Sequence, residues 1–319
     1  QARCIYGHAC FGETRKNVHK LEKNQIDVSK LSTVVGGWPK GNHDEILRQL
    51  NILGMRDVQI ADSFEETRNS ISKDEADIFL VNVNGAGSTA RSIMKDIRNQ
   101  EIGKNPFMVM VSIIQPKDEA EVAETIDSGP DDLLMSPFRR DVFIDRIKEI
   151  GQNRKKFVAT ASFVGPTRRT STRPGRASAP EFEVPNPVRS LGTGVPRETF
   201  WEEIEAAAIS LSSRKVNSDI QMIKSLIEEI VPDYKDSNIG EDFRRRIELL
   251  RSSIDALHSR SMKFGYVNVA NLCDMAGNII TDIGERPVPP NLRHFTVLPK
   301  LMQGFQAALL TWEAPTGTA

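Results

Sequence analysis

Asp77-Ile-Phe-Leu-Val-Asn-Val83 is a nearly unbroken apolar run in the first half of the chain. Strands of a parallel sheet have such runs, because helices cover both of their faces. A second run of the same kind follows at residues 106–112, and an amphipathic helical stretch at residues 89–98 lies between the two. A strand, a helix and another strand in this order predict a βαβ unit.

The same alternation extends over residues 31–150. The pattern predicts further strands at 31–35, 57–61 and 132–135, and further helices at 44–53, 63–71, 117–127 and 141–150. Five strand–helix units in succession predict an α/β fold with a doubly wound, five-stranded parallel sheet. We place this domain at residues 28–150, after an N-terminal extension at 1–27.

A change of composition follows the predicted sheet. Residues 151–195 are rich in proline, glycine, serine and threonine, carry several arginines between Arg154 and Arg176, and have little apolar periodicity. Such a segment buries too little apolar surface to offset its ordering entropy, so we predict a basic linker.

The remaining chain, residues 196–315, has helical periodicity throughout. Helices are predicted at 198–213, 219–231, 241–262, 267–283 and 295–312, with Pro232 ending the second and Pro299 near the start or a kink of the last. Short connections between successive amphipathic helices predict a C-terminal all-α bundle of four or five helices.

Composition limits the partners that we expect. The chain has 319 residues and a formal net charge of −1, so its overall charge attracts neither nucleic acid nor a membrane surface. No apolar window is long enough to span a membrane, and no signal peptide is recognisable. Three cysteines are too few and too scattered for a disulfide framework. We therefore expect a cytoplasmic protein that is not inserted into a membrane.

Two stretches resemble the receiver (CheY-like) domains of bacterial response regulators. Ala76-Asp-Ile-Phe-Leu-Val-Asn-Val-Asn84 is similar to the family's third strand, which ends on the phosphorylated aspartate. Asp127-Ser-Gly-Pro-Asp-Asp-Leu-Leu-Met-Ser-Pro-Phe138 is similar to its fifth strand and the turn that follows. The resemblance covers about residues 28–150. It implies a phosphoacceptor pocket at five positions: Gly36, Gly37, Asn82, Ser112 and Ser136.

The residue types in this pocket depart from the family pattern. Gly36 and Gly37 replace the acidic pair, Asn82 replaces the aspartate and Ser136 replaces the lysine; only Ser112 keeps a hydroxyl. An amide is not a usable nucleophile for an acyl phosphate, and without carboxylates a magnesium ion has few ligands. We therefore predict a degenerate pseudo-receiver that is not phosphorylated and needs no metal or cofactor.

Alternative interpretations of these residues remain open. Asn82 could serve only to hydrogen-bond the backbone of its own loop, and the two glycines could serve only to form a turn. The emptied pocket could also lock the domain in one conformation or bind something other than phosphate.

The predicted linker contains a short motif. Residues 156–169 are similar to a segment that follows receiver domains in some alphaproteobacterial proteins, where Gly-Pro-Asp-Arg-Arg is usual and Thr167 departs from it. Arg168 and Arg169 could bind a phosphate, an acidic surface or a nucleotide through their guanidinium groups. The alternative is a tether, or a strap packed on the neighbouring domain through Phe157, Phe163 and Val164.

The helical half resembles, faintly, a histidine-phosphotransfer bundle. The stretch at residues 255–265, followed by Leu272-Cys273, has the spacing of that family's active helix and next turn. The phosphorylated histidine then falls on Asp255 and a lysine on His258, and a slip of three residues would make His258 the candidate. Near the start of the chain, Cys4, His8 and Cys10 lack a fourth ligand, and we expect no metal there.

These features predict a non-enzymatic signalling or assembly protein that acts through protein contacts, independently of phosphorylation. The resemblance implies a docking face at residues 133–150, and the bundle would supply homo-oligomerisation or a second partner surface, for instance in a motility system. One alternative is nucleotide or nucleic-acid binding through the basic linker, although we expect nucleic acid to be an unlikely partner. Another is a phosphorelay protein that uses His258.

Overall fold

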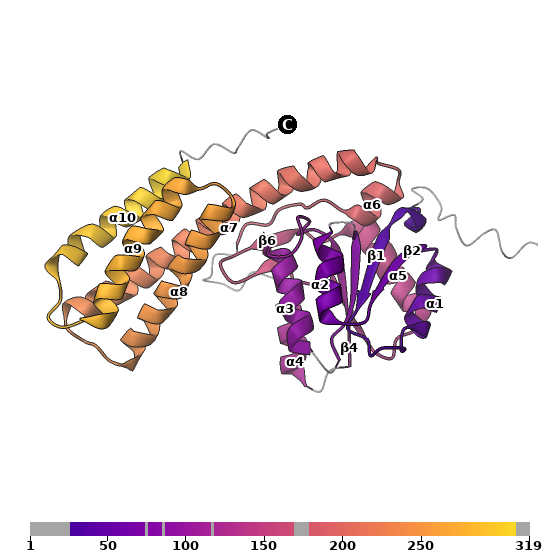
Figure 1. Cartoon of the computed structure of the whole chain (residues 1–319), viewed down its shortest axis with the longest axis horizontal. Coiled ribbons are helices and arrows are strands. Elements are labelled where there is room, and N and C mark those ends of the chain that lie inside the picture. The colour runs from indigo at the N-terminus through magenta and orange to yellow at the C-terminus, as the bar shows by residue number, and fades with distance from the viewer. Residues whose placement is uncertain (1–25, 74–75, 85–86, 116–117, 169–178, 311–319) are drawn as a thin grey trace, which may run out of the picture. The chain divides into compact units, whose positions relative to one another are not determined.

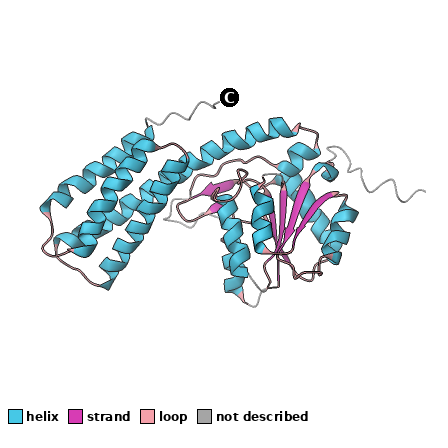
Figure 2. Ribbon diagram, in the orientation of Figure 1, coloured by secondary structure: helices cyan, strands magenta, loops and turns pink. Residues whose placement is uncertain are grey.

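The computed structural model describes residues 26–73, 76–84, 87–115, 118–168 and 179–310. The chain forms two compact units. The first contains the described residues of 1–157, 164–172 and 181–205, and the second those of 158–163, 173–180 and 206–319. Figure 2, which colours helices and strands differently, shows one unit built around a sheet and another built of helices.

The first unit is built on a parallel sheet. Its strands are β1 (Ser32–Gly36), β2 (Asp57–Ala61), β3 (Ile78–Asn82), β4 (Val109–Ile114) and β5 (Asp132–Met135). They lie in the order β2-β1-β3-β4-β5, and each neighbouring pair is parallel. The predicted doubly wound, five-stranded sheet is confirmed. Its central strand β3 is buried at every position, as its apolar run predicts.

Helices cover both faces of this sheet. The helices α1 (Asp44–Leu53) and α5 (Arg140–Asn153) lie on one side, and α2 (Phe64–Ser72), α3 (Gly87–Arg98) and α4 (Glu119–Ile126) on the other (Figure 1). Side chains of Ser63 and Asp118 accept hydrogen bonds from backbone amides at the starts of α2 and α4, which explains where these helices begin. A short 3-10 helix, Val28–Lys30, precedes β1.

The chain after α5 contains elements that the sequence analysis did not predict. The strands β6 (Phe157–Ala159) and β7 (Val164–Pro166) form a two-stranded sheet, and α6 (Pro187–Gly192) follows. Phe157, Val164 and Val188 are buried. The described part of this segment is therefore a strap packed against the protein, which is one of the two alternatives left open. The predicted boundaries at 27, 150, 195 and 315 stay predictions.

The second unit is a helical bundle, as predicted. It is built of the later part of α7 (Arg197–Lys235) with α8 (Glu241–Lys263), α9 (Val267–Glu285) and α10 (Leu292–Leu310). Two helices predicted at 198–213 and 219–231 are one continuous helix, because residues 214–218 contain no glycine or proline to interrupt it. Pro232 lies inside the last turn of α7 rather than ending the helix, and Pro299 lies inside α10.

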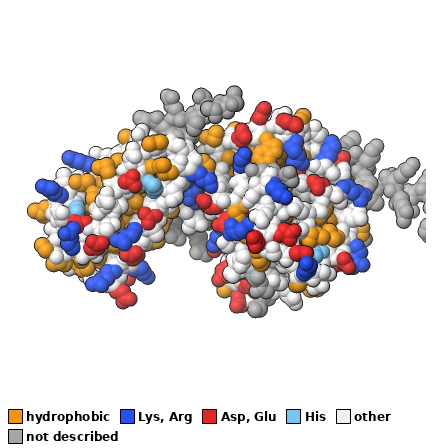
Figure 3. All heavy atoms as spheres, viewed as in Figure 1, with side chains coloured by type: hydrophobic (Ala, Val, Ile, Leu, Met, Phe, Trp, Pro, Cys, Tyr) orange, Lys and Arg blue, Asp and Glu red, His pale blue; other side chains and the backbone are white. Residues whose placement is uncertain are grey.

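An apolar core joins the helices of the bundle. Each helix contributes buried residues at helical spacing, among them Ile223, Leu250, Ile280 and Phe305. Among the described residues, no helix is long and apolar enough to cross a membrane. Acidic and basic side chains are intermixed over the face of the molecule shown in Figure 3, in keeping with the small formal net charge.

Candidate functional site

The structure brings the five predicted pocket positions to one region of the sheet. Gly36 ends β1 and Asn82 ends β3, while Ser136 follows the last residue of β5 and donates its amide hydrogen to Ile114 at 2.7 Å. Ser112 lies on β4, paired with Val81 and Leu133 of the neighbouring strands. Gly36, Asn82 and Ser136 mark the carboxyl edge of the sheet, where ligands bind in doubly wound folds, whereas Ser112 lies two residues before the end of β4.

The space beside the two glycines is filled by the protein itself. A Cβ atom at Gly36 would lie 2.7 Å from the hydroxyl oxygen of Thr67, a buried residue of α2. A Cβ atom at Gly37 would lie less than 3.0 Å from the carbonyl oxygen of Asn82, and Gly37 has a φ of +86°, which favours glycine. Neither position can take a carboxylate side chain without movement of its neighbours.

Asn82 uses its side chain within its own loop. Its Oδ1 atom accepts a hydrogen bond of 3.0 Å from the amide of Asn84, and Asn84 in turn accepts one of 2.6 Å from the amide of Gln115. Only 9% of Asn82 is exposed. This geometry is the loop-capping arrangement considered above as an alternative to a functional role.

The hydroxyl of Ser112 has a partner inside the fold. It lies 3.2 Å from the thioether sulfur of Met94 on α3, and Ser112 is completely buried. Together the five positions supply one amide, two hydroxyls and no carboxylate. Among the described residues, no three His, Cys, Asp or Glu side chains converge in a way that could hold a metal ion.

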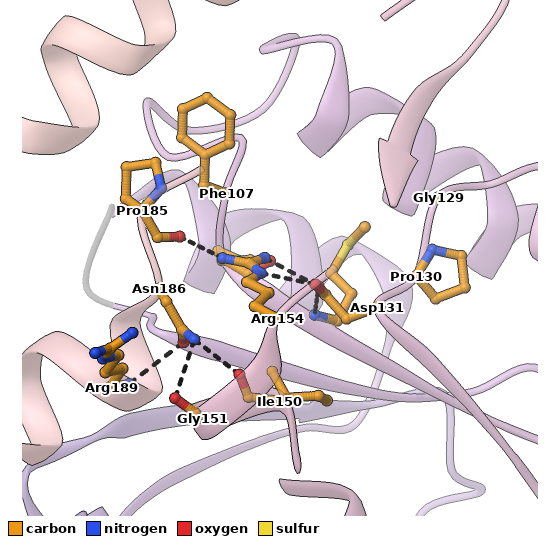
Figure 4. A network of polar contacts seen from close by, with 12 residues as sticks. Phe107, Gly129, Pro130, Asp131, Ile150, Gly151, Arg154, Pro185, Asn186 and Arg189 are labelled. Atoms are coloured by element: carbon orange, nitrogen blue, oxygen red, sulfur yellow. Dashed lines mark hydrogen bonds and ion pairs between the residues drawn. The ribbon is translucent and has the colours of Figure 1, made fainter. Parts of the chain in front are cut away.

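A larger polar network lies at the opposite, amino edge of the sheet, around Asp131 (Figure 4). Asp131 accepts hydrogen bonds from Arg98 at 2.8 Å, from Arg154 at 2.8 Å and from the amide of Met110 at 2.9 Å. The side chains of Asp131, Arg98 and Arg154 are each less than 5% exposed. This is a buried carboxylate shared by two guanidinium groups.

Carbonyl oxygens satisfy the remaining guanidinium hydrogens. Arg98 donates to the carbonyls of Gly129 at 2.9 Å, Pro106 at 2.6 Å and Met108 at 2.9 Å. Arg154 donates to the carbonyl of Pro185. Buried ions are tolerated only when their hydrogen-bonding capacity is used, and this network meets that condition.

The network also perturbs the titration of its members. Burial lowers the pKa of Arg98 to about 10. Burial alone would raise the pKa of Asp131, but the charges of Arg154 and Arg98 outweigh it and hold that pKa below its ordinary value. Phe157 of the strap lies beneath both arginines, with its ring centroid 4.9 Å and 5.1 Å from their guanidinium carbons.

Two further side chains fasten the strap to the first unit. Asn186 donates to the carbonyl of Ile150 at 2.7 Å, at the end of α5, and accepts from the amide of Arg189 at the start of α6 (Figure 4). Arg197, the first residue of α7, donates to both oxygens of the buried Asp77 at 2.9 and 2.8 Å. The strap and the first turn of α7 are thus held at the amino edge of the sheet.

The other predicted residues lie apart from the pocket. Arg168 donates to the carbonyl of Pro130 at 2.6 Å, at the amino edge, and burial lowers its pKa. Arg169 lies outside the described residues, as do Cys4, His8 and Cys10.

The two phosphotransfer-like positions are both on α8, in the second unit. Asp255 is exposed, and His258 is partly exposed with its Nε2 atom 3.3 Å from a carboxylate oxygen of Asp274 on α9.

Sequence reasoning missed the network around Asp131, although one signal was present. Arg98 lies four and eight residues after Met94 and Ala90, on the apolar face of α3. An arginine on the buried face of a helix predicts a buried anionic partner. The identity of that partner depends on tertiary contacts, because Asp131 and Arg154 are 33 and 56 residues away along the chain.

Comparisons with known proteins add the following findings. No protein-family model matches the sequence, and no curated protein matches it. Among solved structures, a response regulator from Thermotoga maritima is 20% identical with a TM-score of 0.33, over 38% of this chain and 96% of that chain. The Vibrio cholerae chemotaxis protein CheY4 is 17% identical with a TM-score of 0.33, over 38% and 98%. FixJ-N is 14% identical with a TM-score of 0.33, over 39% and 94%.

The first unit has the receiver-like fold that the sequence predicts. That statement rests on its own strand order, β2-β1-β3-β4-β5 with helices on both faces, which is the flavodoxin-like arrangement found in CheY. A fold of this kind hosts many functions, so the function has to be argued from the site.

Proposed function

We propose that this chain is a non-enzymatic signalling protein of the two-component type, whose receiver-like unit acts through protein contacts without accepting a phosphoryl group. The observation that carries the proposal is the filled space at Gly37, beside the carbonyl oxygen of Asn82. A receiver that merely lacked its aspartates could regain them by substitution. Here a Cβ atom at Gly37 would meet the backbone of Asn82, so a carboxylate side chain at this position would require the loop to move, which supports the proposal.

The proposed docking face lies on β5 and α5, within residues 133–150. Met135 of β5 is 52% exposed and Val142 of α5 is 39% exposed. Apolar side chains exposed on neighbouring elements favour a protein partner over a small polar ligand. The bundle would provide homo-oligomerisation or a second contact surface, in a cytoplasmic signalling or motility system.

Phosphorylation is the first test. The purified chain and an Asn82→Asp variant would be incubated with acetyl phosphate and magnesium, next to an intact receiver domain, and separated by phosphate-affinity electrophoresis. We expect a phosphorylated band from the intact receiver alone, because Asn82→Asp restores the acceptor but not the metal ligands. Label on the unmodified chain at the carboxyl edge would overturn the proposal.

Self-association is the second test. Light scattering after size-exclusion chromatography would give the molar mass with and without acetyl phosphate and magnesium. We expect the same mass under both conditions, and a mass above 35.6 kDa would indicate assembly. A Met135→Glu variant that loses the assembly would assign it to β5, and a Met275→Glu variant that loses it, at an equally exposed position, would assign it to the bundle.

Other observations and experiments examine the alternatives. Arg154 and Arg168 already bind acceptors of their own chain, which disfavours them as nucleotide ligands. Nucleic-acid binding through the basic segment would weaken steeply with salt. His258 would be tested by transfer from a phosphorylated histidine kinase, where we expect no label on the chain.

A further inference from the structure

The bundle contains a buried lysine whose charge has no carboxylate partner of its own. Lys215 of α7 is 3% exposed, and its ammonium group donates hydrogen bonds of 2.9 Å to the carbonyl oxygens of Thr160 and Ala161. Within the described residues, no carboxylate oxygen lies within 4.0 Å of its Nζ atom. Neutral carbonyl dipoles are the only acceptors that this cation has among them.

The nearby charges do not balance it. Asp219, one turn further along α7, is engaged by Arg260 of α8 at 3.0 Å, and both side chains are largely buried. Two cations and one anion leave this buried group with a charge of +1. Burial first, and then the charge of Arg260, lower the pKa of Lys215 to about 8. A buried excess charge is costly unless an opposite charge is supplied.

The two carbonyls belong to the turn between β6 and β7. The turn is closed internally, because the amide of Thr160 donates to the carbonyl of Phe163 at 2.8 Å and the amide of Phe163 donates to the hydroxyl of Thr160 at 3.1 Å. Residues 160–163 are half-buried or exposed, whereas Phe157, Ala159 and Val164 at the base of the hairpin are buried. The tip is therefore the less buried part of the hairpin.

We propose that the hairpin tip, Thr160 and Ala161, is a displaceable occupant of an anion site formed by Lys215 and Arg260, and that a small oxyanion competes with the tip for it. The carbonyl oxygens occupy the acceptor positions that two oxygens of a phosphate-like anion would take. A lysine ammonium is a compact point charge suited to such an anion. Binding of the anion supplies the missing negative charge and releases the hairpin tip, so the tip blocks the site when no anion is bound. This inference is independent of the proposed role of the receiver-like unit.

Hydrogen exchange measured by mass spectrometry on the full chain tests the competition, with inorganic phosphate as the probe. We expect saturating phosphate to speed amide exchange of residues 158–163 about fivefold, the lower end of usual coupling between two sites. Potassium chloride at the same ionic strength is the control for general screening. An equal effect of chloride, or no effect of phosphate, would overturn the proposal.

Substitutions distinguish the site from its surroundings. Lys215→Gln keeps a donor for the carbonyls but removes the charge, so the response to phosphate should disappear. Lys224→Met, on the same helix and 41% exposed in its side chain, is the matched control and should respond as the natural chain does. Circular dichroism reports whether Lys215→Gln folds, and Lys215→Arg, which keeps the charge, should then retain the response if the site exists. A phosphate response that persists in Lys215→Gln would contradict the inference.

Discussion

At the scale of single residues, two glycines of the first unit let neighbouring groups come close to the backbone, because a glycine has no Cβ atom. Gly36 leaves room for Thr67, and Gly37 allows the backbone to approach Asn82. The side-chain oxygen of Asn82 accepts a hydrogen bond from the amide of Asn84. The positions that would carry an acidic pair in a receiver are closed by ordinary packing, and the loop is held by ordinary hydrogen bonds.

Gly37→Ala tests this closure, with Gly41→Ala as a matched control. Both glycines have a left-handed backbone, with φ of +86° and +85°, but a Cβ atom at Gly41 would meet nothing within 4 Å. We expect Gly41→Ala to cost about 1 kcal/mol of unfolding free energy, from backbone strain alone. Gly37→Ala should cost about 1–3 kcal/mol more, because the added methyl overpacks the site. Equal losses in urea titrations would mean that the site can relax.

Asp131→Ala tests the buried ion network, with Asp132→Ala as its neighbouring control. Removing Asp131 leaves Arg98 and Arg154 buried without an anion, so we expect a loss of about 3–5 kcal/mol. Asp132 lies 3.5 Å from an Arg146 side chain that is 53% exposed, and its removal should cost less than about 1 kcal/mol. Urea unfolding of both variants decides the comparison, and similar losses would contradict a central role for Asp131.

The ion network around Asp131 also predicts how stability responds to acid. Since the pKa of Asp131 is lower in the folded chain than in the unfolded chain, its contribution is present above the ordinary value of 3.8 and is lost as the pH falls below it. The difference in stability between the natural chain and Asp131→Ala should therefore shrink in acid.

Lys215 predicts a response of the same sign in alkali, where stability again rises with pH. Its pKa is about 8 in the folded chain against an ordinary 10.5, so between these values the unfolded chain binds the extra proton. The unfolding free energy should therefore rise with pH from about 8 to about 10.5, by up to about 3 kcal/mol from this group. Lys215→Met removes the titration, and the natural chain and the variant should have unfolding curves whose separation changes over that interval. A constant separation would show that the ammonium is well solvated.

At the scale of elements, the strap differs most from what its composition predicts. Residues 154–168 and 179–196 have the composition of a linker, yet Arg154, Phe157 and Asn186 hold the described part in place. Ile26 is fitted in the same way, because a Cβ atom at Gly151 or Gly192 would lie 2.5–2.6 Å from its side chain. A few specific anchors thus order a segment that lacks an apolar stripe of its own.

Arg197→Ala tests the anchor at the start of α7. Asp77 is 2% exposed and would keep one amide partner, from Ser32, but lose its cation. We expect a loss of about 2 kcal/mol, less than for a fully buried pair, because Arg197 is 39% exposed in its side chain. Faster hydrogen exchange should appear in the first turns of α7. Arg189→Ala, an exposed position on α6, should leave both quantities unchanged.

At the scale of the whole molecule, the chain contains separate cores. One apolar cluster lies between the sheet and its helices, and another lies inside the bundle, and the two clusters share no residue. The helix α7 contributes to both compact units, since Arg197 binds Asp77 in the first and Ile220 is buried in the core of the second.

Leu250→Ala tests whether the cores behave separately. Leu250 is completely buried in the bundle, and its truncation should cost about 2–5 kcal/mol in that unit. Hydrogen exchange should become faster in α8 and α9, while the amides of β3 and β4 keep their protection. Uniform loss of protection over both units would show that the molecule unfolds as one cooperative block.

The sequence by itself determined the α/β fold, the order of its elements and the helical character of the second half. Apolar runs and helical periodicity are local signals, and short connections leave few ways to assemble them. The bounds of α1, β2 and β5 agree with the predicted ranges to the residue. The residue types at Gly36, Gly37 and Asn82 also exclude a carboxylate at these positions, and the chemical consequence stays a prediction.

Only the tertiary structure decided how these residues are used. The filling of Gly36 by Thr67, the pairing of Asp131 with Arg98 and Arg154, and the contact of Lys215 with the hairpin tip join residues 23–55 positions apart in the chain. No local pattern encodes such pairs, since charge and size are compatible with many partners. Burial selects among those partners, because an ion or a hydrogen-bonding group removed from water is stable only where packing provides its complement.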